Sequence, residues 1–196
     1  MKIKKSNIKK ITYVISTVLV LAIIFFAVSS SQSQKQKALI QTNYGSITIQ
    51  LNPSKAPITV ANFENYVNQN FYDGTVFHRV IKGFMIQGGG FTTSGTQKQT
   101  NSPIKLESNN GLSNKKYSIA MARTNDPNSA TSQFFINTAD NKFLDYGVRD
   151  QGYAVFGKVI NGFDTVDKIE NVQTTTKGQL QNWPIENVII KKVILI

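Results

Sequence analysis

Residues 77–91 read "FHRVIKGFMIQGGGF", a mostly apolar stretch interrupted by a few polar side chains. It holds two apolar runs of the length of buried strands, separated by a Lys-Gly pair. Three side chains are unexpected in strands that only fill a core: the arginine Arg79, the glutamine Gln87 and the chain's single histidine, His78. The stretch therefore predicts two strands with one face in the core and a second face whose polar side chains serve another purpose than core packing.

Alternation along the strands assigns these polar groups to faces. Successive side chains of a strand point to opposite sides, so Arg79 should share a face with Phe77 and Ile81. By the same rule, Met85 should lie beside Gln87. We expect this outer face to mix hydrogen-bonding groups with large apolar ones.

A third apolar run, "SQFFINT" at residues 132–138, repeats the pattern and groups Gln133 with Phe135. Large apolar side chains rimmed by a few hydrogen-bonding groups are typical of a binding groove, whereas an idle outer face carries Thr, Lys and Glu. The alternative is one buried arginine paired with a distant acid such as Glu107. The pattern favours the groove.

The rest of the chain predicts a mainly β domain. Residues 38–51 alternate on either side of Asn43–Gly45, which indicates a hairpin. Further short strand-like runs are expected at 75–81, 84–88, 117–122, 132–138, 153–160 and 188–196. Many short strands at close spacing favour a closed barrel or a sandwich.

Two segments have the apolar spacing of helices instead. Residues 56–71 contain Pro57 near the expected start, with Thr59 as the expected N-cap. A second helix is expected to open at Asp164. A β-barrel covered by two helices fits this order of elements.

The amino-terminal part differs from the rest in composition. A lysine-rich start runs into the uncharged apolar stretch 11–28, so we expect residues 1–29 to be a signal peptide or an uncleaved membrane anchor. Lysines stay on the cytoplasmic side, which places the rest of the chain outside the cytoplasm, in the periplasm, secreted or held at the inner membrane. Residues 30–37 then form a polar linker, and residues 38–196 form the folded domain.

Charge and cysteine content exclude several functions. The chain has 196 residues, no cysteine and a net charge of +11, but residues 1–37 hold seven lysines and no acid, which leaves 11 − 7 = +4 for the remainder. So small an excess gives no stripe for binding nucleic acid. No disulfide, thiolate nucleophile or cysteine-ligated metal is possible. We expect neither a metal nor a cofactor.

Three blocks carry a resemblance to a known family. "FHRVIKGFMIQGGGF", "SIAMARTNDPNSATSQFFIN" and "GYAVFGKVINGFDTVDKI" resemble the signature blocks of the cyclophilins, the peptidyl-prolyl cis-trans isomerases, and most of all their bacterial secreted branch. The resemblance covers about Ala38 to Ile196. It implies an eight-stranded antiparallel β-barrel capped by two helices, with substrate bound on the outer face.

The resemblance also implies the residues of the site. Arg79 takes the place of the catalytic arginine. The residues implied for binding the substrate are Phe84, Met85, Gln87, Ala122, Arg123, Gln133, Phe135, Phe143, Leu144 and Tyr153.

Three of these positions depart from the best-known eukaryotic members. Phe143 replaces a tryptophan, Tyr153 replaces a histidine and Arg123 replaces an asparagine. Phenylalanine lacks the ring N–H donor of tryptophan, which puts binding of the immunosuppressant cyclosporin in doubt. Bacterial members show similar replacements, so isomerase activity is still expected.

Other kinds of chemistry fit the sequence poorly. His78 should face away from Arg79, and rotation about a peptide bond needs no general base, so we expect a structural histidine with a satisfied ring nitrogen. Ser132 lacks the surroundings of a hydrolase nucleophile. The glycines at 88–90 lack the lysine of a phosphate loop and should serve a tight turn at a strand end.

Two functions remain on the sequence alone. The first is a monomeric isomerase that acts on proline-containing unfolded or extended polypeptides and assists folding outside the cytoplasm. The second is a proline-peptide binding module or holdase chaperone, in which isomerisation is incidental. Both need the apolar groove, but only the enzyme needs Arg79.

Overall fold

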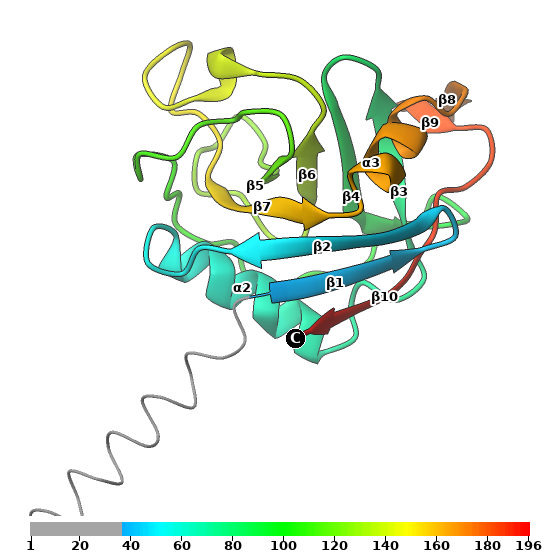
Figure 1. Ribbon diagram of the computed structural model, residues 1–196, viewed down its shortest axis with the longest axis horizontal. Coiled ribbons are helices and arrows are strands. Elements are labelled where there is room, and N and C mark those ends of the chain that lie inside the picture. The colour runs from blue at the N-terminus through cyan, green and yellow to red at the C-terminus, as the bar shows by residue number, and fades with distance from the viewer. Residues whose placement is uncertain (1–36) are drawn as a thin grey trace, which may run out of the picture. The chain divides into compact units, whose positions relative to one another are not determined.

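The computed structural model describes residues 37–196, which form a barrel-like antiparallel sheet with two α-helices (Figure 1). Eight strands pair in the order β10-β1-β2-β7-β5-β6-β4-β3. Their bounds are β1 Lys37–Thr42, β2 Gly45–Leu51, β3 Thr75–Ile81, β4 Met85–Thr92, β5 Ser118–Met121, β6 Phe134–Asn137, β7 Val155–Asn161 and β10 Ile190–Leu195. The helices are α2 Pro57–Asn68 and α3 Phe163–Glu170, and Figure 1 shows them on opposite sides of the sheet.

The barrel is nearly closed between its two end strands. Gly74 N–H donates to Ile190 C=O and Phe77 N–H donates to Val188 C=O, each at 2.9 Å. Between them, Val76 and Ile189 form an isolated antiparallel bridge. The predicted eight strands and two helices are confirmed, and closure rests on this short seam rather than on a full ladder between β3 and β10.

The expected hairpin at the start of the domain forms with a two-residue loop. Thr42 pairs with Gly45, so Asn43 and Tyr44 make the turn and Gly45 already belongs to β2. Asn43 also bonds to Ile189 through both its backbone N–H and its side-chain oxygen. The turn thereby ties the first hairpin to the chain that enters β10.

The start of helix α2 differs from the prediction. Thr59 lies inside the helix and is not its N-cap; the cap position belongs to Ala56, which offers no side-chain hydrogen bond. The carboxylate of Glu107 instead accepts from the N–H groups of Ile58 and Thr59 at 3.1 and 2.8 Å, and from the Thr59 hydroxyl at 2.7 Å. A negative group at a helix N-terminus is favourable, so a distant acid replaces the local cap.

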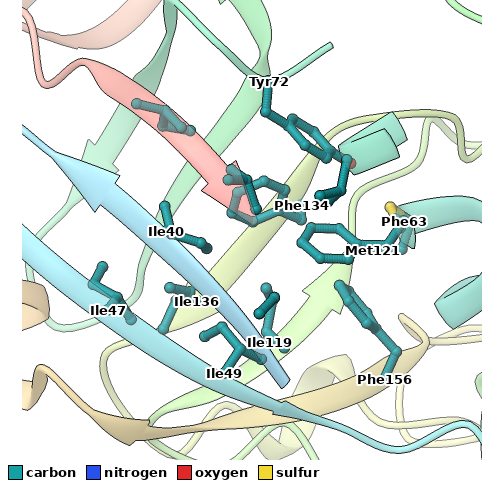
Figure 2. Close-up of a cluster of buried hydrophobic side chains, with 14 of the residues drawn as sticks. Ile40, Ile47, Ile49, Phe63, Tyr72, Ile119, Met121, Phe134, Ile136 and Phe156 are labelled. Atoms are coloured by element: carbon teal, nitrogen blue, oxygen red, sulfur yellow. The ribbon is translucent and has the colours of Figure 1, made fainter. Parts of the chain in front are cut away.

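The barrel interior is filled by aliphatic and aromatic side chains (Figure 2). Phe63 of α2 lies 5.3 Å from Tyr72, 5.8 Å from Phe134 and 5.4 Å from Phe156, between ring centroids. These rings fill the space beside the isoleucines of β1, β2, β5 and β6, which are Ile40, Ile47, Ile49, Ile119 and Ile136. The core fixes the strands whose other face forms the site.

One pair of strands was not predicted. β8 Thr174–Lys177 and β9 Leu180–Pro184 form a two-stranded hairpin apart from the main sheet. The first strand, "TTTK", has no apolar alternation, because it is mostly exposed. Trp183 of β9 is buried and donates to the Oδ1 of Asn187 at 3.0 Å.

The expected signal or anchor segment and most of the expected linker lie outside the described residues. Within residues 37–196, no helix combines the length and the apolar character needed to cross a membrane.

Candidate active site

A second apolar cluster lies on the outer face of the strands that enclose the core. It joins Met85, Ala120, Phe135, Leu144 and Val155, all buried. On the strands, the residues that follow Met85, Ala120, Phe135 and Val155 belong to the barrel core, because side chains alternate along a strand. The predicted outer apolar surface therefore exists, and it is separate from the core.

A pocket of about 300 Å³ opens over this cluster. The structure brings together every residue that the sequence implied for the site except Gln133, and it adds Arg149. The lining consists of Arg79, Phe84, Met85, Gln87, Ala122, Arg123, Phe135, Phe143, Leu144, Arg149 and Tyr153. Leu144 belongs to a short 3-10 helix, η2 Lys142–Leu144, that follows β6.

A chain of hydrogen bonds runs from Arg79 along the pocket. Arg79 Nη1 donates to Gln87 Oε1 at 3.4 Å, and Gln87 Nε2 donates to Gln133 Oε1 at 2.9 Å. Gln133 thus touches the site through Gln87 although it does not line the pocket. The two glutamines restrict the positions that the guanidinium can take.

Arg79 has no acidic partner among residues 37–196. The acid considered as its partner, Glu107, caps helix α2 instead. Burial lowers the pKa of Arg79, and the neighbouring Tyr153 opposes that shift. An arginine nonetheless stays protonated at neutral pH, so the pocket holds an uncompensated positive charge beside its apolar wall.

The prediction that Phe77 shares a face with Arg79 is wrong. Phe77 is fully buried in the barrel core, with its ring 6.0 Å from that of Phe134, whereas Ile81 packs against the outer cluster. The pairing of β3 with β4 shifts between Phe77 and Arg79. An irregularity of this kind interrupts simple alternation and turns Arg79 outward.

The glycines of β4 shape the site from within the strand rather than from its end, which corrects their predicted role. Gly89 has φ +83°, a conformation that favours glycine. At Gly90, a Cβ atom would lie 2.5 Å from Cγ of Gln133. A side chain there would displace the glutamine that supports Gln87.

Arg123 and Tyr153 form another part of the pocket wall. Arg123 donates to the carbonyls of Gly152 and Thr124 at 2.9 and 2.8 Å and to Asp150 at 2.9 Å, and it lies 4.6 Å from the Tyr153 ring centroid. The hydrogen bond from the Gly152 N–H lowers the pKa of Asp150, and the charge of Arg123 adds to that effect. The Arg123 guanidinium is therefore committed to the wall of the pocket.

Three buried asparagine amides lie behind the apolar wall, and no pattern in the sequence indicates that they come together. Asn141 donates to the Phe84 carbonyl and to Asn137 Oδ1, both at 2.7 Å. Asn114 donates to the Leu144 carbonyl at 3.1 Å and accepts from Asn137 at 3.3 Å. This asparagine network joins the backbones of two pocket residues.

His78 contacts the rings of Phe91 and Trp183, with centroids 4.6 and 6.3 Å away, and does not line the pocket. Burial lowers its pKa to about 4, and the charge of Arg79 acts in the same direction. The Nδ1 of His78 is buried without a hydrogen-bond partner within residues 37–196, and the expectation of one satisfied ring nitrogen stays a prediction for Nε2. In the same part of the chain, no three acidic or histidine side chains cluster as metal ligands would.

Comparison with known proteins agrees with this geometry. The family model of the cyclophilin-type peptidyl-prolyl cis-trans isomerases matches residues 37–195. A "Peptidyl-prolyl cis-trans isomerase A" of Dickeya dadantii is 50% identical over 181 residues, which are 92% of this chain and 95% of that protein. A "Peptidyl-prolyl cis-trans isomerase" of Acinetobacter baylyi is 59% identical over 154 residues, covering 79% and 82%.

The fold is also similar to that of a solved cyclophilin. The crystal structure of a Cryptosporidium parvum cyclophilin-type peptidyl-prolyl cis-trans isomerase, determined in the presence of the dipeptide Ala-Pro, has a TM-score of 0.71. It is 32% identical, and the match covers 82% of this chain and 99% of that one. Together with the pocket on the outer face of the barrel, these matches show that the chain belongs to the cyclophilin-type peptidyl-prolyl cis-trans isomerases.

Proposed function

We propose that the outer pocket binds a proline of an extended polypeptide and that Arg79 speeds rotation about the bond preceding that proline. The observation that carries the proposal is the guanidinium of Arg79, which has no acidic partner within residues 37–196 and stands beside an apolar pocket. The Ala-Pro dipeptide of the Cryptosporidium structure supports a proline ligand for this fold.

The physical task is to lower a rotational barrier without breaking a bond. An X-Pro amide resists rotation because its C–N bond has partial double-bond character, with a barrier of about 18–20 kcal/mol. In the twisted state the prolyl nitrogen regains its lone pair. A catalyst must bind this state more tightly than either planar state.

Arg79 can supply that preference. Its fixed, planar guanidinium donates to the prolyl nitrogen or to the carbonyl of the proline when the bond twists. Gln87 orients it through the 3.4 Å hydrogen bond and is itself held by Gln133. A donor positioned in advance loses little energy in reorganisation as the lone pair develops.

The apolar wall keeps the ring still while the preceding residue swings. Met85, Phe135 and Leu144 are each at most 4% exposed, so they offer a preformed surface for a proline ring. Phe135 packs edge-on against Tyr153, with ring centroids 5.6 Å apart. This contact supports the Phe135 ring from the side, which suits a pocket that must hold the proline ring while the preceding residue rotates.

The test is isomerisation of an X-Pro peptide by the full chain and by Arg79→Lys. Lysine keeps the charge but lacks the planar guanidinium fork, so kcat/KM should fall about tenfold or more while the unfolding free energy stays the same. In Gln87→Ala, kcat/KM should fall by less, because this change removes the residue that orients the donor rather than the donor itself. Equal activity of Arg79→Lys and the wild type would refute the role of the fork.

The holdase alternative uses the same pocket without the arginine. It predicts that Arg79→Ala suppresses aggregation of an unfolded protein as well as the wild type does. If Arg79→Ala also keeps its isomerase activity, binding rather than catalysis is the function of the site. The Arg79–Gln87–Gln133 chain favours catalysis, since binding alone gives it no task.

The proposal extends to where the enzyme works. The lysine-rich start and the apolar stretch 11–28 support export, with a monomeric domain that assists folding in the periplasm, either released or anchored to the inner membrane. The mass of the protein recovered from the periplasm and from the membrane fraction tests this. A start near Ser30 means cleavage and an intact start means an anchor, whereas recovery only from the cytoplasm refutes export.

A further inference from the structure

All three arginines of the chain line the same pocket. They are Arg79, Arg123 and Arg149, and none of the 19 lysines lines it. No acidic residue lines it either. Within residues 37–196, the acid that pairs with these guanidinium groups is Asp150. The pocket and its rim therefore carry an excess of positive charge.

The three arginines differ in their hydrogen bonds within the protein and in their exposure to solvent. Arg123 is committed to two carbonyls and to Asp150, with a side chain only 5% exposed. Arg79 points into the pocket and donates to Gln87. The side chain of Arg149 is 56% exposed, and its one ion pair is long, with Nε 3.4 Å from Oδ2 of Asp150 within residues 37–196.

The position of Arg149 suits a group that meets the peptide beside the proline. Its guanidinium lies 5.7 Å from the centroid of the Phe143 ring, which stacks in turn with Phe84 at 5.7 Å. Neither terminal nitrogen of Arg149 donates a hydrogen bond within residues 37–196. Asp150 cannot satisfy the whole fork, because its Oδ1 already accepts from Arg123 and from the Gly152 N–H.

We propose that Arg149 is a specificity-determining residue that favours substrates with an Asp or Glu side chain flanking the proline. This inference rests on the proposed function, since it concerns the substrate class of the same pocket. A carboxylate fits the planar fork of arginine, and the excess positive charge of the pocket attracts it. A lysine at the same place on the peptide is repelled.

The experiment compares peptides that differ only at the residue beside the proline: Glu, Gln or Lys, in one series before the proline and in another after it. For the wild type at low salt, kcat/KM should be about two- to fivefold higher with Glu than with Gln in at least one series, the range of an exposed ion pair. The ratio should shrink at high salt.

Variants separate this inference from the function itself. Arg149→Ala should bring the Glu-to-Gln ratio close to one, and Arg149→Glu should reverse the order of the Glu and Lys peptides. Lys191→Ala, which removes one charge from β10 outside the pocket, is the matched control and should keep the wild-type ratio. Isomerisation with ratios that are the same in all four proteins overturns the role of Arg149. No isomerisation of any peptide by the wild type overturns the proposed function instead.

Discussion

The two faces of β6 each carry a phenylalanine, and the two phenylalanines have different roles. Phe134 points into the barrel, where its ring meets Phe63, Tyr72 and Phe77. Phe135, its neighbour in the chain, points outward into the pocket and contacts Tyr153. Both are almost fully buried, with 0% and 4% of their surface exposed. Burial alone therefore does not distinguish a core residue from a residue of the site. The face of the strand on which the side chain lies makes the distinction.

This contrast explains why an apolar pocket can coexist with a stable fold. The core needs close packing on every side, whereas the outer cluster keeps one side open for a ligand. If the two faces are independent, substitutions on one should change stability and substitutions on the other should change activity.

Phe134→Ala should give the largest loss of stability. Removing a ring from the centre of the core leaves a cavity and costs about 3–5 kcal/mol of unfolding free energy. Denaturant unfolding followed by the fluorescence of the single tryptophan measures it. A loss below about 1 kcal/mol would mean that the inner face is not the core on which the fold depends.

Phe135→Ala should affect activity more than stability. The pocket loses the apolar surface that holds the proline ring, worth about 1.5–3 kcal/mol, so kcat/KM should fall about 10- to 100-fold. The unfolding free energy should fall by less than in Phe134→Ala, because the outer cluster is already open. Equal destabilisation by the two variants would remove the distinction between the faces.

His78, the neighbour of Arg79 on β3, is buried outside the pocket, and the effect of that burial on stability can be tested with pH. Burial holds the pKa of folded His78 at about 4, below the ordinary value of 6.5, so the unfolded chain takes up the proton first. Stability is complete above pH 6.5 and is lost as the pH falls towards 4. Between pH 7.5 and pH 5 the loss should be about 2 kcal/mol.

His78→Gln supplies the control for that pH dependence. The variant has no imidazole to titrate, so its unfolding free energy should change much less over the same interval. The hydrogen-bonded carboxylates Asp145 and Asp150 have lowered pKa values and stay charged in this interval. An unchanged slope in His78→Gln would assign the effect to other groups.

Asn137→Leu should change both stability and substrate binding, because the asparagine network connects the sheet to the pocket wall. The change removes the hydrogen bonds to Asn114, Ser118 and Asn141, and leaves buried partners unsatisfied at a cost of about 1–2 kcal/mol. KM should rise as Phe84 and Leu144 loosen. Asn68→Ala, at the exposed end of α2, is the control and should change neither quantity.

Much of this arrangement was accessible from the sequence, and the exceptions have physical causes. Period-two alternation identified Met85, Gln87 and Phe135, because β4 and β6 are regular at those positions. It failed at Phe77, where the β3–β4 pairing shifts register. Local pattern cannot reveal a break that depends on the partner strand.

Long-range contacts explain the other failures. Glu107 caps α2 from 48 residues away, so the local search for a cap settled on Thr59. Arg149 and the asparagine network enter the site through a loop and through buried amides, neither of which follows a periodic pattern. Three arginines among 22 basic residues were visible in the sequence, but only the fold gathers them in one pocket.

The most direct test of the central claim, that the outer face performs the reaction through Arg79, measures Arg79→Ala twice. On one sample, kcat/KM for an X-Pro peptide and the unfolding free energy are determined beside the wild type. We predict a loss of about 10²–10³ in kcat/KM, the effect of removing one preorganised donor, with stability within about 0.5 kcal/mol. Wild-type turnover in a folded Arg79→Ala protein would contradict the claim.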